Sequence, residues 1–126
     1  MSTSIRIMKI PGPDHPITLA PSGQKLRVKF RGELIAESVD ALVMHEAGYP
    51  PVYYFPRKDV RMEKLARTDH HTWCPYKGEA SYFSLLMGGA SEENAVWTYE
   101  SPFHAVADIR ELLAFYRNKI DGIEAV

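Results

Sequence analysis

The chain has 126 residues, which is enough for one domain with a single core and too short for two. Apolar residues make up 45% of it and charged residues 25%, and its net charge is −1 at pH 7. This ordinary globular balance argues against a general attraction to nucleic acids or anionic membranes, so any polyanion site would be local.

No segment has the pattern of a membrane span or an export signal. No apolar run is long enough to cross a bilayer, and residues 1–6 lack the order of a secretory signal. The single cysteine, Cys74, cannot form an internal disulfide. We therefore expect a cytoplasmic protein without a membrane partner. We expect one domain over residues 1–126, in which residues 1–14 form an N-terminal extension with a first short strand.

The first regular pattern predicts a β-hairpin. Apolar and basic residues alternate over Lys25–Arg31, so they point to opposite faces of a strand. Gly32 supplies a tight turn, and Leu34–Ala36 returns as the partner strand.

Two short strands are predicted next. The apolar run Ala41–Met44 reads as a strand or a short helix, and the Gly48–Pro51 break favours a strand. Residues Val52–Phe55 are rich in β-formers and end at Pro56, which predicts a short strand at a sheet edge.

The second half of the chain predicts an antiparallel pair and a helix. Ala80–Leu86 and Ala95–Tyr99 are strand-like, and the polar segment Gly88–Asn94 separates them as a loop. A further set of apolar residues has helical spacing after Ser101-Pro102: Ile109, Leu112, Leu113, Tyr116 and Ile120. The pattern as a whole predicts a mainly β, single compact domain of antiparallel sheets with a short C-terminal helical segment.

Several blocks, in this order, resemble those of the domain of unknown function 427 family, which is sometimes labelled nucleotidyltransferase-like. They are His15–Thr18, Gly32–Ser38, Tyr49–Pro56, Asp59-Val60, Cys74–Gly78 and Trp97–Tyr99. The resemblance covers nearly the full chain and implies a Mss4-like or β-tent fold, in which antiparallel sheets lean together, often around a zinc site or a small-molecule pocket. It also implies a strand at Ala114–Tyr116 after a short helix at Ala105–Ile109. Residues Arg110-Glu111 stand where the resemblance implies a turn glycine, so the boundary of this strand stays open.

The residues do not support the nucleotidyltransferase label. Nucleotidyl transfer needs clustered carboxylates that hold Mg²⁺ against phosphates. The acidic residues of the central region are instead scattered: Asp59, Glu63, Asp69 and Glu79. The sequence thus leaves open whether the protein is an enzyme.

We expect no zinc site and no other cofactor. Zinc bound tetrahedrally wants four ligands, and only half a site can be drawn from His70, His71 and Cys74. We interpret Thr68–Thr72 instead as a polar surface turn.

The motifs around Cys74 predict a pocket for a small, anionic molecule. Flat apolar walls and a few polar groups are the usual lining of such a site, and the candidates are Tyr54, Arg57, Asp59, Thr72, Cys74, Lys77, Tyr82 and Trp97. Lys77-Gly78 would present an ammonium and an open backbone amide to a carboxylate or phosphate. The alternative for Tyr82 and Trp97 is plain core packing, and the alternative for Asp59 is a turn cap.

An enzyme is the second hypothesis. Lys77, three residues from Cys74, would lower the pKa of the thiol, and His71 would act as its base. The group Arg57, Asp59 and Lys77 is another candidate centre, whereas a lone cysteine is more often a small buried hydrophobe.

A homodimer without a ligand is the third hypothesis, because exposed strand edges and aromatics favour self-association. Four cations line one face of the first strand: Lys25, Arg27, Lys29 and Arg31. No aromatics lie between them, so we do not expect nucleic acid there. We interpret them as charges that keep a solvent-facing or edge strand from pairing.

Overall fold

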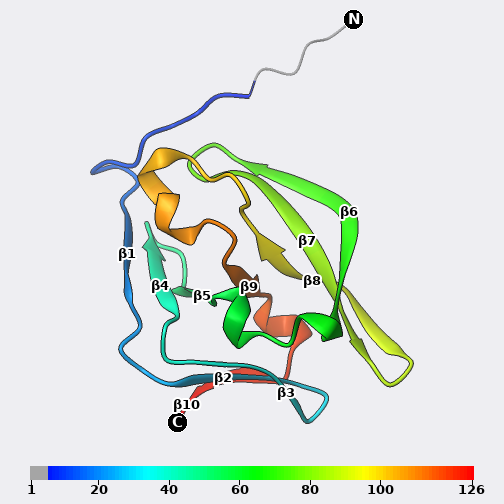
Figure 1. Ribbon diagram of the computed structural model, residues 1–126. Helices are drawn as coiled ribbons and strands as arrows, with labels where there is room; N and C mark the ends of the chain where they lie inside the picture. Colours follow the sequence, from blue (N-terminus) through cyan, green and yellow to red (C-terminus); the bar gives the residue numbers. More distant parts are fainter. Residues whose placement is uncertain (1–5) are drawn as a thin grey trace, which may run out of the picture.

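Ten strands and four short 3₁₀ helices make up residues 6–126, the part of the chain that the computed structural model describes (Figure 1). The strands form three antiparallel sheets in one compact domain, as the sequence predicts. The first sheet has the order β1-β4-β5, with β1 at Ile17–Pro21, β4 at Leu42–Glu46 and β5 at Val52–Tyr54. The second has the order β10-β2-β3, with β2 at Leu26–Phe30, β3 at Glu33–Ser38 and β10 at Gly122–Ala125.

The third sheet has the order β6-β7-β8-β9 and contains the longest strands. Their bounds are Leu65–Cys74 for β6, Gly78–Met87 for β7, Ala90–Thr98 for β8 and Leu113–Phe115 for β9. The short helices lie in the connections, with η1 at Arg57–Asp59, η2 at Met62–Lys64, η3 at His104–Ile109 and η4 at Arg117–Lys119.

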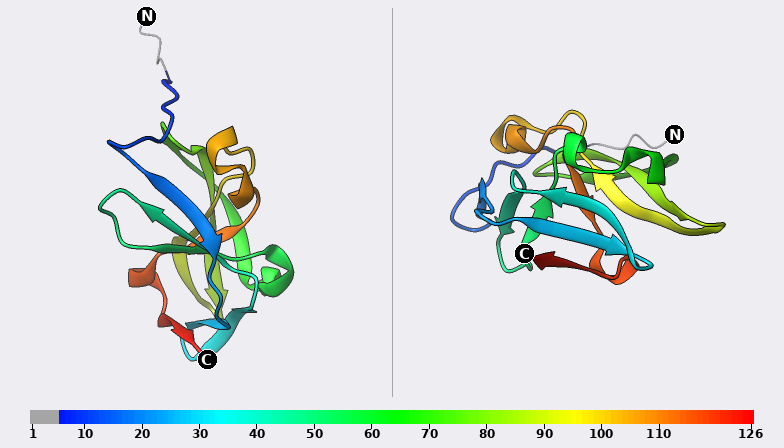
Figure 2. Two further views of the ribbon diagram at one scale, coloured as in Figure 1. Left: turned by 90° about the vertical axis from the view of Figure 1, so that its left-hand side faces the viewer. Right: turned by 60° about the horizontal axis from the view of Figure 1, so that its bottom comes forward.

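The predicted hairpin is confirmed by the β2–β3 pair. Leu26, Val28 and Phe30 are buried, because alternation turns every second side chain to the core. Gly32 has φ +79° in the turn. The side chain of Asp121, just before β10, accepts hydrogen bonds from the backbone N–H of Arg31 at 2.9 Å and of Gly32 at 2.7 Å. This carboxylate connects the hairpin turn to the C-terminal strand. Figure 2 shows that strand beside β2.

The basic stripe does not guard a sheet edge, so that interpretation was wrong in this respect. Strand β2 lies between β10 and β3. Lys25 pairs with Glu37 at 3.4 Å, and Lys29 pairs with Glu124 at 3.2 Å. The stripe therefore balances carboxylates on the two flanking strands.

The strands predicted at Ala41–Met44 and Val52–Phe55 are confirmed as β4 and β5, and β5 ends the order of its sheet. The predicted pair at Ala80–Leu86 and Ala95–Tyr99 is confirmed by β7 and β8, but the predicted loop is too long. Only Gly88 and Gly89, both with positive φ, separate the two strands. Residues Ser91–Asn94 belong to β8 in spite of their polarity, and Ser91 and Glu92 pair with Leu86 and Leu85 of β7.

The helix expected from the spacing of Ile109 to Ile120 is wrong, and the arrangement implied by the family resemblance is confirmed. Helix η3 ends at Ile109, and strand β9 follows at Leu113–Phe115. Glu111 adopts φ +63° between them, a left-handed conformation that no α-helix continues through. A glutamate thus takes the role of the expected turn glycine.

The polar turn predicted at Thr68–Thr72 is also wrong. These residues lie inside β6, whose pairing with β7 shifts between Arg67 and His71. The register shift indicates a bulge, which is why this exposed segment lacks a regular alternation.

Direct backbone pairing joins the first and third sheets. Phe55, after β5, and Leu113, in β9, each donate a backbone hydrogen bond of 2.8 Å to the other. Phe55 and Leu113 are both fully buried, in the cluster that also contains Val28 from the second sheet. A second buried cluster contains Met44 and Tyr54 of the first sheet and Tyr82 of the third, so two clusters join the sheets.

The N-terminal segment runs across the turn that joins β6 and β7. The backbone N–H of Lys9 donates to the carbonyl of Pro75 at 2.8 Å, and Arg6 pairs with Glu79 at 3.0 Å. Within residues 6–14, β-type pairing is limited to an isolated bridge from Gly12 to His15. Residues 1–5 of the extension predicted for 1–14 lie outside the described residues. None of the helices in residues 6–126 is long and apolar enough to cross a membrane.

Candidate functional site

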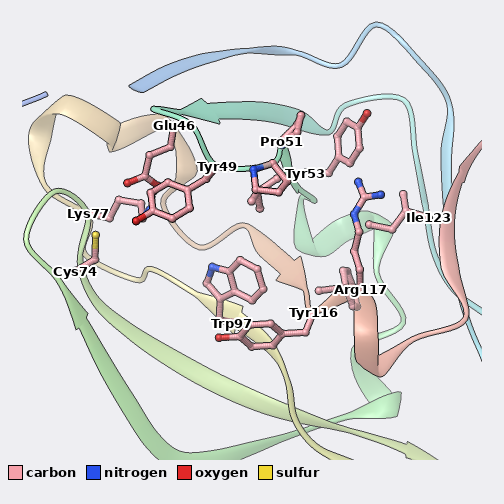
Figure 3. A pocket seen from close by; sticks show the side chains of 13 residues that line it. Glu46, Tyr49, Pro51, Tyr53, Cys74, Lys77, Trp97, Tyr116, Arg117 and Ile123 are labelled. Carbon is pink, nitrogen blue, oxygen red and sulfur yellow. The ribbon is translucent and has the colours of Figure 1, made fainter. Parts of the chain in front are cut away.

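An open pocket of about 560 Å³ lies where the three sheets approach one another (Figure 3). Its walls come from β4, β5, β8, β9 and β10, from the end of β6 and the start of η4, and from the turns between β4 and β5 and between β6 and β7. The lining residues are Glu46, Tyr49, Pro50, Pro51, Val52, Tyr53, Cys74, Lys77, Trp97, Phe115, Tyr116, Arg117 and Ile123. The volume and the largely apolar lining are those of a small-molecule site.

Aromatic rings form one wall of the pocket. The ring of Trp97 lies 4.5 Å from that of Tyr116, at 45° to it. Behind Trp97, the buried ring of Tyr54 meets it edge-on at 6.4 Å. Trp97 is only half-buried, so the packing behind it holds the indole in place while part of the ring stays open to the pocket.

A carboxylate and an ammonium form one end of the pocket. The Nζ of Lys77 donates a hydrogen bond to Oε1 of Glu46, and Nε2 of His15 donates to Oε2 of the same side chain at 2.7 Å. The His15 ring stacks on Tyr76 at 3.9 Å. Burial alone would raise the pKa of Glu46, but these hydrogen bonds outweigh it and hold the pKa below its usual value.

Local chain geometry positions Lys77. The turn between β6 and β7 closes through a hydrogen bond of 3.3 Å from the N–H of Lys77 to the carbonyl of Cys74. Gly78 follows with φ +105°, a conformation that favours glycine. The carbonyl of Lys77 accepts from the N–H of Phe103 at 3.1 Å, so the turn is fixed from both sides.

The guanidinium of Arg117 lies at the other end. Figure 3 places Trp97 between Arg117 and Lys77. The guanidinium carbon lies 5.6 Å from the centre of the Tyr53 ring, a cation–π distance. Among the described residues, no carboxylate lies within ion-pair distance of Arg117.

Cys74, Lys77 and Trp97 are the predicted site residues that line the pocket. Tyr54 supports it from behind, through Trp97. Cys74 is a half-buried free thiol near Lys77 (Figure 3).

Thr72 and Tyr82 lie in a neighbouring part of the third sheet. Their hydroxyls are 2.8 Å apart, and the Tyr82 hydroxyl is 3.2 Å from that of Tyr116. Tyr82 lines a smaller hollow with His70 and Lys119, and Tyr116 forms a wall of both hollows. Tyr82 therefore borders the pocket through Tyr116 and through Trp97, its cross-strand partner, but neither Thr72 nor Tyr82 lines it.

Arg57 and Asp59 lie elsewhere, and the structure does not bring them to Lys77. Arg57 donates to the carbonyl of Glu111 at 2.7 Å and to the hydroxyl of Thr98 at 3.3 Å. Asp59 accepts from the hydroxyl of Ser38 at 2.6 Å, beside a separate hollow next to β3. Their side chains thus connect elements of the fold.

The sequence did not reveal most of the lining, including Tyr53 and Tyr116. The charged lining residues that it did not reveal are Glu46 and Arg117. Glu46 is 31 positions from Lys77, and no motif marks either residue. The block His15–Thr18 did mark one of the residues bound to Glu46, although no role followed from it. A charged residue at the end of a mostly apolar strand is the only signal that Glu46 offers.

The described residues contain no group of three or more His, Cys, Asp or Glu side chains arranged to hold a metal ion. His71, from the half-site considered above, lies 3.7 Å from Glu79 and 3.4 Å from the hydroxyl of Ser81. It thus makes polar contacts with strand β7.

The comparison with protein families agrees with the resemblance seen in the sequence blocks. A search of curated proteins finds no match. A family model described as a domain of unknown function, DUF427, matches residues 18–125, which include the whole pocket lining and, apart from Ile17, all three sheets. The chain therefore belongs to the DUF427 family.

Proposed function

We propose that this protein binds a small, largely apolar, anionic metabolite in the pocket between its three sheets. The observation that carries the proposal is the lining itself: open aromatic faces at Trp97 and Tyr116, flanked by the two cations Lys77 and Arg117. A ligand that covers these faces would gain about 25 cal/mol for each Å² of apolar surface removed from water.

The proposal includes a cytoplasmic location, where the free thiol of Cys74 stays reduced. It also includes a Mss4-like arrangement, in which leaning sheets shelter a pocket for a small molecule. Binding is proposed without turnover, because Arg57 and Asp59 are engaged elsewhere and Lys77 is held by Glu46.

A thermal-shift screen against a metabolite library tests the proposal. A compound that binds only the folded chain stabilises it by about 2.7 kcal/mol at 100 times its Kd. We expect at least one anionic compound to raise the Tm in a concentration-dependent way. The effect should be lost in Trp97→Leu and kept in Trp73→Leu, the matched control, because Trp73 packs on Phe103 outside the pocket.

Two results would overturn the proposal. One is a screen without any stabilising compound. The other is a compound that stabilises Trp97→Leu as strongly as the wild-type chain, because binding would then occur away from this pocket.

A homodimer that covers the pocket is the second candidate. It is favoured by Tyr49 and Tyr116, which line the pocket and are 65% and 36% exposed, since exposed aromatics are typical of interface cores. Light scattering, which measures the molar mass in solution, distinguishes this homodimer from a monomer with an open pocket. A dimer that Tyr49→Lys dissociates supports this candidate, and a monomer at all concentrations excludes it.

A further inference from the structure

The lining cation that is available to pair with an anionic ligand is Arg117 and not Lys77, although Lys77 stands in the recognisable block Cys74–Gly78. Three lining side chains are charged at neutral pH: Glu46, Lys77 and Arg117. Glu46 and Lys77 neutralise each other through a hydrogen-bonded ion pair whose side chains are only 15% and 12% exposed. The remaining positive charge of the lining is therefore on Arg117.

Arg117 is also presented in a form that suits a planar anion. A guanidinium is a flat fork that binds the two oxygens of a carboxylate together. In this chain its carbon lies 5.6 Å from the centre of the Tyr53 ring, and no described residue supplies a carboxylate to it. The ring holds the guanidinium at the pocket without neutralising it.

The space beside Arg117 fits a flat apolar body. In Figure 3, Pro51 stands on the opposite side of the pocket from Trp97, and Tyr116 extends the same wall as the indole. A planar ring placed between Pro51 and Trp97 would cover apolar surface on both of its faces. A rigid ring also loses less conformational freedom on binding than a flexible chain does.

A phosphate is a poorer match for this end of the pocket. Phosphate sites in proteins usually combine several donors, such as a nest of backbone amides or a helix N-terminus with cations. Among the described lining residues, Arg117 is the only cation that is not already paired.

We propose that the pocket takes a flat aromatic acid, whose ring lies against Trp97 and whose carboxylate pairs with Arg117. This inference rests on the proposed function, because it names the class of ligand for the same pocket. Lys77 and Glu46 then form a neutral wall at the far end, which needs no charge on the ligand.

The test compares two probes that differ in charge, 2-naphthoate and 2-naphthamide, by titration calorimetry at low ionic strength. We expect the wild-type chain to bind the carboxylate at least about fivefold more tightly than the amide, as for an ion pair that is partly open to solvent. The preference should disappear in Arg117→Gln. It should persist in Arg61→Gln, the matched control, since Arg61 is exposed beside a different hollow.

The dependence on ionic strength and a third probe test the ion pair and the flat ring separately. Raising the ionic strength should reduce the preference for the carboxylate, since the pair is screened. Decanoate carries the same charge on a flexible chain and should bind more weakly than 2-naphthoate. Tighter binding of decanoate would contradict the flat ring.

The outcomes distinguish this inference from the proposed function. If both naphthyl probes bind equally well and Trp97→Leu abolishes both, the pocket assignment stands and the role of Arg117 is wrong. If the preference for 2-naphthoate over 2-naphthamide persists in Arg117→Gln, the role of Arg117 is likewise wrong. If neither probe binds at its solubility limit, the aromatic-acid inference is overturned, while the library screen still decides the proposed function.

Discussion

The ammonium of Lys77 donates a hydrogen bond to the carboxylate of Glu46, and the two side chains, 31 positions apart in the chain, are 12% and 15% exposed. The pair connects β4 of the first sheet to the turn between β6 and β7 of the third. His15 adds a second hydrogen bond to the same carboxylate. Glu46 therefore holds together three segments at one end of the pocket.

Removing the charge of Glu46 should destabilise the fold. In Glu46→Gln the largely buried Lys77 ammonium loses its counter-ion, and we expect the free energy of unfolding to fall by about 1–3 kcal/mol. Urea denaturation measures this change. The matched control is Glu124→Gln, because Glu124 pairs with Lys29 at 3.2 Å but is 57% exposed, and its loss should cost less than about 0.5 kcal/mol. Equal effects of the two substitutions would contradict this account of Glu46.

The same carboxylate should contribute to acid sensitivity. Burial raises the pKa of Glu46, but the hydrogen bonds from Lys77 and His15 lower it more, so the folded pKa lies below the unfolded one. This stabilisation is fully present above the unfolded pKa, near about 4.3, and is lost as the pH falls through the folded pKa. Unfolding free energies measured between neutral and acidic pH should therefore decline less steeply in Glu46→Gln than in the wild-type chain.

Other carboxylates keep part of the decline in that variant. Hydrogen bonds from Arg27 lower the pKa of Glu37, those from Arg67 lower that of Glu100, and backbone N–H groups lower that of Asp121. Identical pH profiles for Glu46→Gln and the wild-type chain would show that the folded chain does not lower the pKa of Glu46.

Replacing Glu111 by glycine should increase the free energy of unfolding. Glu111 adopts φ +63°, a region that costs about 1 kcal/mol or more for a residue with a Cβ. Its backbone N–H and carbonyl bond to Tyr99 and Arg57, and Glu111→Gly keeps both bonds. We expect a gain of up to about 1 kcal/mol in unfolding free energy, measured by urea denaturation.

Glu93→Gly is the control for this substitution. Glu93 is an exposed residue inside strand β8 and is not among the residues with positive φ, so glycine should cost about 0.5–1 kcal/mol there. Destabilisation by Glu111→Gly of the same size as by Glu93→Gly would mean that the conformation of residue 111 carries no strain.

Substituting Cys74 distinguishes a ligand-binding protein from an enzyme that uses this thiol. Serine nearly preserves its volume, so Cys74→Ser should bind a ligand found by the screen within about threefold of the wild-type affinity. Iodoacetamide should label Cys74 more slowly when the ligand occupies the pocket, because this thiol lines it. An enzyme that uses Cys74 as its nucleophile would instead convert the ligand and lose turnover in the serine variant.

The strands could be predicted where one face of the strand is buried and the other is exposed to solvent. Lys25–Arg31 shows the required alternation, and this segment contains β2, the first strand of the β2–β3 hairpin. Strand β6 could not be found in this way, because most of its middle residues are exposed and a register shift interrupts the pattern. The apolar spacing from Ile109 to Ile120 misled for another reason. The positive φ of Glu111 breaks the element, and the residue type does not signal that conformation.

The candidate site could be predicted only as far as local motifs reach. Cys74, Lys77 and Trp97 stand in recognisable blocks and line the pocket. Asp59 stands in such a block too and Arg57 directly follows one, but their side chains bond to Ser38 and Thr98 away from the pocket. Glu46 and Arg117 reach the pocket through the pairing of distant strands, which single-sequence patterns do not encode.

The most direct test of the central claim is the emission of Trp97 during a ligand titration. In Trp73→Phe, Trp97 is the only tryptophan left, so its fluorescence reports on the pocket wall alone. The account predicts a saturable change in emission with the same Kd that calorimetry gives for the ligand. A ligand that binds and stabilises the protein while the emission of Trp97 stays constant would contradict it.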